Sequence, residues 1–171
     1  TLNMWPALTV GQKSSGQDSM AAANLAAVAL GAVARGGRGG AEVVTVGAFG
    51  MRGAPTGIGV IAQRLAETHV TEKPTVVIER YTDGQRSVFV AYLPGMRTLA
   101  VGAGSEPFDL AASVHQLADP DSATSQKAVE EALRAAGVKP NDELVVAGYS
   151  QGGMVAGGLA AGSGEFNVTA I

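Results

Sequence analysis

A serine flanked by glycines follows an apolar run near the C-terminal end of the sequence. The run Leu144-Val-Val-Ala147 is typical of a buried strand, and Gly148-Tyr-Ser-Gln-Gly152 follows it directly. This spacing is that of a nucleophile elbow, a sharp turn from strand to helix on which the serine hydroxyl projects while the glycines let neighbouring backbone approach. We therefore predict that Ser150 is a nucleophile and that Gly148 and Gly152 shape its turn.

Acyl transfer by a serine requires backbone donors for the oxyanion and a base that removes the hydroxyl proton. The N–H of Gln151, which follows the nucleophile, is one predicted donor, and Gly95 or Met96 is expected to provide the second. No histidine follows Ser150 in the sequence. His115 is a weak alternative base, and a polar loop residue is the simpler interpretation of it.

Two strands are expected before the elbow, joined as a hairpin. Residues 75–81 and 86–93 are β-type runs, and Asp83-Gly84 between them is a strong hairpin signal. An irregular loop is then expected over 94–121, and unstructured segments of that length in compact domains are usually functional. The loop contains three candidates for substrate contact, which can equally pin it to the core: Met96, Phe108 and Leu110.

Helices and strands alternate after this loop. A helix is expected over 122–136, a strand over 143–148, the elbow helix to about residue 161 and a further strand over 166–171. This order predicts an α/β protein with three layers and a mostly parallel sheet, which the chain enters through the antiparallel hairpin.

The N-terminal part is expected to be separate from this sheet. Residues 1–17 are polar and turn-rich, a helix is predicted over 20–34, and the glycine-rich run 35–40 follows as a linker. We therefore divide the chain into an arm and helix with linker, residues 1–40, and an α/β domain, residues 41–171.

A short strand over 42–46, several glycines and a helix over 56–69 open the second part. Strand, glycines and helix together are a weak signal for a dinucleotide-binding turn, because the glycine spacing is not that of the fingerprint. His69 falls at the C-terminal end of the expected helix, where an imidazole interacts favourably with the helix dipole.

Composition narrows the possible partners. The 171 residues carry a formal charge of -3, which disfavours a nucleic-acid partner. The apolar stretch 20–34 is too short to span a bilayer, so no stable membrane insertion is expected, and no convincing signal peptide fixes a location. There is no cysteine, and the two histidines lie far apart, so neither a metal nor an organic cofactor is indicated.

With these elements in place, residues 75–171 resemble bacterial α/β-hydrolases of the lipase and esterase type. The resemblance is carried by Pro94-Gly95-Met96, Glu106-Pro-Phe-Asp109 and Gly148-Tyr-Ser-Gln-Gly-Gly-Met154. Met96 stands where that family commonly has a hydroxyl residue, and Tyr149 where it commonly has histidine. The elbow also resembles that of cutinases, which usually carry disulfides.

The resemblance implies a serine hydrolase that cleaves small-molecule or lipid esters through an acyl-enzyme on Ser150, without a cofactor. In that family the acid and the histidine follow the nucleophile, so they are expected after residue 171 or from a second chain that completes the fold. The fold would then be incomplete at its C-terminus. The alternative is a catalytically silent hydrolase-like module used for binding or secretion.

Overall fold

The computed structural model describes residues 23–32, 41–70, 75–82, 86–99, 107–162 and 164–171. Several features expected from the sequence lie outside the described residues: the N-terminal arm, the glycine-rich linker, the Asp83-Gly84 turn and Glu106. The side chains of β1, of residues 41–51 of β2 and of Ser122 are not described either.

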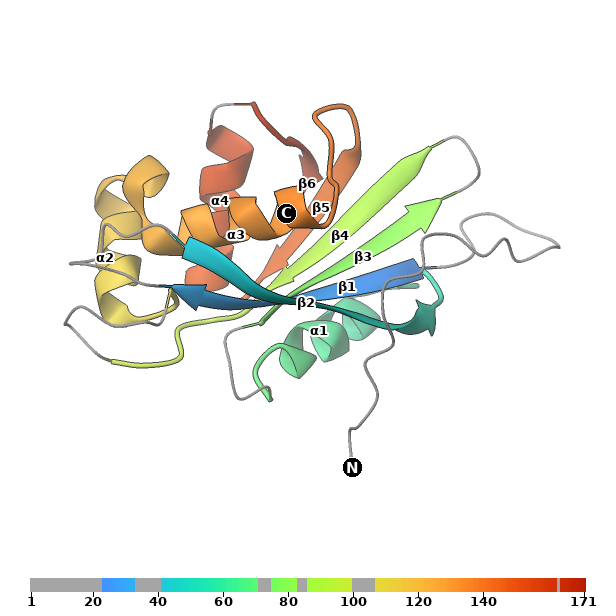
Figure 1. Cartoon of the computed structure of the whole chain (residues 1–171), viewed down its shortest axis with the longest axis horizontal. Coiled ribbons are helices and arrows are strands. Elements are labelled where there is room, and N and C mark those ends of the chain that lie inside the picture. The colour runs from blue at the N-terminus through green and yellow to red at the C-terminus, as the bar shows by residue number, and fades with distance from the viewer. Residues whose placement is uncertain (1–22, 33–40, 71–74, 83–85, 100–106, 163) are drawn as a thin grey trace, which may run out of the picture.

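Within the described residues, six strands form one mixed sheet in the order β2, β1, β3, β4, β5, β6 (Figure 1). They are β1 (Ala23–Ala32), β2 (Ala41–Arg52), β3 (Thr75–Thr82), β4 (Ser87–Leu93), β5 (Glu143–Gly148) and β6 (Asn167–Ala170). The α/β class, the β3–β4 hairpin and the parallel pairing of β5 with β4 and β6 are confirmed. A mostly parallel sheet is wrong for the described strands, because β1 pairs antiparallel with both β2 and β3.

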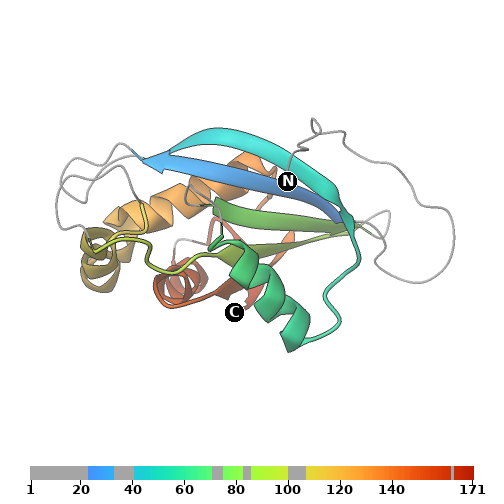
Figure 2. The same cartoon turned by 90° about the horizontal axis from the view of Figure 1, so that it is seen from below.

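Helices cover both faces of the sheet (Figures 1 and 2). They are α1 (Ile58–Glu67), α2 (Leu110–Ala118), the short 3-10 helix η1 (Pro120–Ser122), α3 (Thr124–Ala135) and α4 (Gln151–Ala161). Alternate residues of β3 and β4 point to opposite faces. Val76 and Ile78 pack with the side chains of α3 and α4, whereas Val77 packs toward α1. No described helix has the length and apolar character needed to cross a membrane.

The helix predicted over 20–34 is wrong, because residues 23–32 form β1, which pairs on both of its sides within the sheet. Hydrogen bonding to two neighbouring strands outweighs the helix propensity of an alanine-rich segment. The strand predicted over 42–46 extends to Arg52, so Gly47 lies within β2 opposite Ala27 rather than in a dinucleotide-binding turn.

The irregular loop predicted over 94–121 is also wrong in its second half, which folds as α2 and η1. Asp109 provides the local reason, since its carboxylate accepts a hydrogen bond of 2.7 Å from the N–H of Ala112 and caps the helix. His115 is consequently a helix residue and not a loop residue.

Candidate active site

Ser150 lies in a strained turn between β5 and α4. Its φ of 52° and ψ of -114° make it the one non-glycine residue with positive φ in the described part of the chain. Sparsely populated backbone conformations cost about 1 to 3 kcal/mol, and they concentrate at functional sites. The residue is exposed, and its side chain makes no capping hydrogen bond to α4. Its hydroxyl is therefore accessible at the N-terminal end of a helix.

The two elbow glycines are in close backbone contact. A Cβ on Gly152 would fall 2.5 Å from the Leu93 carbonyl oxygen and 2.6 Å from that of Pro94. A Cβ on Gly148 would fall 2.6 Å from the Gly153 nitrogen and closer still to the Gly152 carbonyl. At both glycines, these distances leave no room for a side chain. The start of α4 can thus pack directly against the end of β4.

This packing places the loop after β4 beside the elbow. The Tyr149 N–H points to the Leu93 carbonyl at 3.4 Å, and a Cβ on Gly95 would meet the Tyr149 ring at 2.8 Å. The structure therefore brings the segment that carries Gly95 and Met96 next to the segment that carries Ser150 and Gln151, although the two segments are far apart in the sequence.

The predicted oxyanion donors differ in whether their N–H groups already donate a hydrogen bond to another described residue. In the first turn of α4, the Gly152 N–H bonds the Tyr149 carbonyl and the Gly153 N–H bonds the Ser150 carbonyl, both at 2.9 Å. The Gln151 N–H has no acceptor among the described residues, as is usual at the start of a helix.

In the loop after β4, the Gly95 N–H donates to Nε2 of His69 at 3.3 Å. The neighbouring Met96 N–H has no acceptor among the described residues, and Met96 is exposed. Met96 therefore fits the role of second donor better than Gly95 does.

His69 is the site residue that the sequence pattern did not reveal. It follows the end of α1, and its ring meets the Tyr149 ring edge to face, with centroids 5.7 Å apart and an interplanar angle of 83°. The sequence shows only a histidine at the C-terminal end of an expected helix, and nothing local indicates that this helix end meets the elbow.

The other sequence candidates lie in different surroundings. His115 is half-buried on α2, and within the described ranges no contact joins its side chain to Ser150. Phe108 is fully buried in the main core, which favours the interpretation that it pins the loop, and Leu110 is half-buried at the start of α2.

The side chain of Gln151 is fully buried, and neither atom of its amide has a hydrogen-bond partner among the described residues. A buried amide without partners costs about 1 to 3 kcal/mol per group. The role predicted for Gln151, donation to the oxyanion, uses its backbone N–H and does not involve this side chain.

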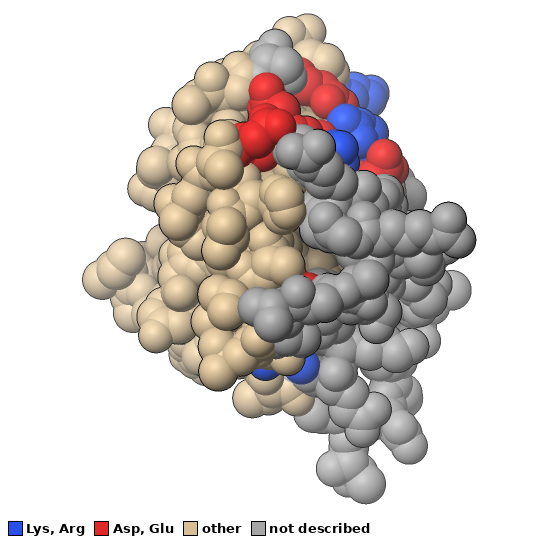
Figure 3. Space-filling model, turned by 90° about the vertical axis from the view of Figure 1, so that its left-hand side faces the viewer, with Lys and Arg blue, Asp and Glu red and all other residues tan. Residues whose placement is uncertain are grey.

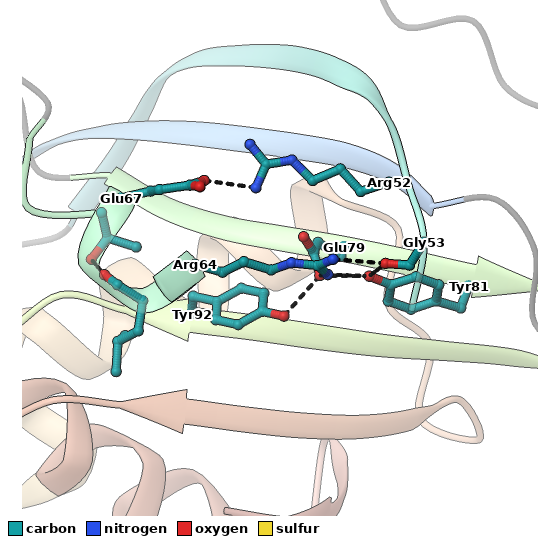
Figure 4. Close-up of polar contacts among 9 residues, drawn as sticks. Arg52, Gly53, Arg64, Glu67, Glu79, Tyr81 and Tyr92 are labelled. Atoms are coloured by element: carbon teal, nitrogen blue, oxygen red, sulfur yellow. Dashed lines mark hydrogen bonds and ion pairs between the residues drawn. The ribbon is translucent and has the colours of Figure 1, made fainter. Parts of the chain in front are cut away.

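A buried polar cluster lies on the opposite face of the sheet, under α1 (Figure 4). Arg64 of α1 contacts the Glu79 carboxylate at 2.5 Å, the Tyr81 hydroxyl at 2.7 Å and the Gly53 carbonyl at 2.7 Å. The hydroxyls of Tyr81 and Tyr92 also donate to Glu79, at 2.6 and 2.8 Å. Burial, reinforced by the Glu79 carboxylate, raises the pKa of both tyrosines well above the ordinary value.

The side of the molecule that carries α2 is mostly uncharged in its described part, with charged side chains gathered toward one end (Figure 3). Val114 and Leu117 are exposed apolar side chains of α2. The described residues contain no group of three or more side chains suited to a metal ion. Neither a scan against protein-family models nor searches of curated proteins and solved structures found a match to this chain.

Proposed function

We propose that this protein is a serine hydrolase of α/β-hydrolase type that cleaves carboxylic esters of small molecules or lipids. The observation that carries the proposal is the strained, exposed Ser150 at the start of α4, between glycines whose positions admit no side chain. Strain of this kind is retained where it serves a function, and a nucleophile elbow requires both glycines.

The reaction follows from the groups around the elbow. The Ser150 Oγ attacks the ester carbonyl carbon, and the Gln151 and Met96 N–H groups donate to the oxyanion that forms. The positive end of the α4 dipole stabilises the same negative charge. The tetrahedral intermediate then expels the alcohol and leaves an acyl group on Ser150, which water removes in a second step.

The proposed mechanism also needs a base for the serine proton. Among the described residues, no imidazole or carboxylate bonds the Ser150 hydroxyl, and Nε2 of His69 is engaged by Gly95. We propose that the base is a histidine, oriented by an acid, from a segment after residue 171 or from a second chain.

Hydrolysis of p-nitrophenyl esters of increasing acyl length tests the proposal. Ser150→Ala should lower kcat by at least about 10⁴-fold, because the covalent step is lost. Ser87→Ala is the matched control. Ser87 is the first residue of β4, whereas the elbow packs near Leu93, the last residue of the same strand. The variant should retain the parent rate within about twofold, as expected for a substitution away from the site. Turnover that survives in Ser150→Ala would sink the proposal.

No described residue acts as a base toward Ser150, and this also supports a second candidate, a catalytically silent module that binds ligands through a hydrolase-like site. A silent module would hydrolyse none of the esters with all chains of the native protein present. It would also bind an ester or its acid product equally well in the parent protein and in the Ser150→Ala variant, which equilibrium dialysis can measure.

A further inference from the structure

Three separate segments meet at the His69 side chain. The imidazole follows the end of α1, accepts a hydrogen bond from Gly95 in the loop after β4, and packs edge to face against Tyr149 of the elbow. The contact is tight, because a Cβ on Gly95 would lie 3.3 Å from His69 Cε1 and 2.8 Å from Tyr149 Cδ1. Gly95 is buried between these two side chains.

The hydrogen bond specifies the chemical form of the ring. A backbone N–H can only donate, so Nε2 of His69 must be the unprotonated nitrogen. In a neutral imidazole the proton then resides on Nδ1. Neither an ammonium nor an aliphatic side chain accepts a hydrogen bond, so few residue types can replace histidine in this contact.

The same hydrogen bond distinguishes the N–H groups of the two neighbouring loop residues, Gly95 and Met96. With the Gly95 N–H directed to His69, the Met96 N–H is the one left without an acceptor among the described residues. Oxyanion donors act through fixed geometry, and a displacement of about 1 Å can cost about 100-fold in rate. A group that fixes Gly95 also fixes the position of the Met96 amide.

We propose that His69 is a positioning residue of the ester hydrolase site. His69 accepts the Gly95 N–H and packs on Tyr149, so it holds the loop after β4 in place beside the elbow. This leaves Met96 as the second oxyanion donor. The catalytic part of this inference rests on the proposed function, whereas the tautomer of His69 does not.

The tautomer is measured on the unaltered protein by long-range proton–nitrogen NMR after labelling with ¹⁵N-histidine. The chain has two histidines, so His115 is an internal comparison and His115→Asn assigns the signals. At a pH where His69 is neutral, its ring should show the Nδ1–H tautomer. A ring protonated on Nε2, or an averaged mixture of both tautomers, would overturn the contact with Gly95 and the proposal with it.

Two substitutions test the catalytic consequence. His69→Phe keeps a flat ring without an acceptor, and it should lower kcat for a p-nitrophenyl ester by about 10- to 100-fold with KM changed less than about threefold. His69→Gln restores an acceptor oxygen, and it should recover kcat to within about threefold of the parent protein.

The outcomes separate this inference from the proposed function. If the parent protein hydrolyses esters through Ser150 and His69→Phe matches it in kcat, His69 has no positioning role while the function stands. If His69→Gln is as slow as His69→Phe at equal thermal stability, the acceptor is not what matters and the proposal is wrong. If the parent protein hydrolyses no ester, the proposed function fails, and with it the catalytic role of His69.

Discussion

The backbone of Ser150 is the feature of a single residue that bears most on function. Its positive φ is unusual for an L-residue, and the neighbouring glycines hold it between β5 and α4. The conformation stores free energy that folding must overcome, so it should be visible in stability as well as in activity.

Ser150→Gly should be more stable than Ser150→Ala by about 1 kcal/mol in free energy of unfolding. Glycine removes strain of about 1 to 3 kcal/mol but loses up to about 1 kcal/mol through the greater entropy of its unfolded chain. Urea unfolding monitored by circular dichroism measures the difference. Equal stability, or a less stable glycine variant, would show that the turn is not strained.

The glycines of α4 provide a second test, because they differ in their surroundings. Gly152→Ala should lower the free energy of unfolding by about 1 to 3 kcal/mol, since its Cβ would collide with the Leu93 and Pro94 carbonyls. Gly157→Ala is the control in the same helix: apart from the neighbouring backbone of α4 itself, no atom lies within 4 Å of the added Cβ, and the change should raise stability by up to about 1 kcal/mol. Opposite or equal effects would contradict the close packing of β4 on α4.

Among the elements, α1 is held to the sheet by charged and polar groups. Arg64 reaches the fully buried Glu79 of β3, and Arg52 at the end of β2 pairs with Glu67 of α1 at 2.7 Å (Figure 4). Because His69 lies two residues after the end of α1, the position of this helix also determines where the imidazole lies relative to Gly95.

Glu79→Ala should lower the free energy of unfolding by about 3 to 5 kcal/mol, because it leaves the Arg64 charge buried without its partner. Glu143→Ala removes the ion pair with the exposed Arg86 and should cost less than about 1 kcal/mol. Thermal or urea unfolding of the two variants measures the contrast. Similar losses would mean that the buried cluster does not anchor α1.

The sequence predicted best those elements that are determined locally. The β3–β4 hairpin, β5 and α4 follow from β-type runs and from glycines at fixed spacing. It failed for β1, because an alanine-rich segment becomes a strand only by pairing with β2 and β3, which are distant in sequence. His69 was missed for the same reason, since its contacts with Gly95 and Tyr149 exist only in the folded chain.

For the whole molecule, the position of β1 between β2 and β3 is the feature with the clearest test. The chain has no cysteine, so an introduced pair reports its own contact alone. Asn24 lies opposite Arg80 in the antiparallel register. Cysteines at 24 and 80 should form a disulfide on mild oxidation, because opposite Cα atoms in such a pair are about 4.5 to 5.5 Å apart.

The matched control moves one cysteine to residue 25, which lies opposite Glu79 rather than Arg80 in the register. Thiol titration should show both thiols consumed in the 24/80 pair and both free in the 25/80 pair. A disulfide in the 25/80 pair but not in the 24/80 pair would contradict the register of β1 on β3.

The central claim, that Ser150 is a nucleophile, is tested most directly by mapping where a fluorophosphonate reacts. Mass spectrometry of the labelled and digested protein should find one phosphonyl adduct on Ser150, absent from Ser150→Ala and unchanged in Ser87→Ala. The labelling is done with all chains of the native protein present, because a serine hydroxyl is a weak nucleophile until an adjacent base takes its proton. No adduct with all chains of the native protein present, or an adduct that persists in Ser150→Ala, would contradict the claim.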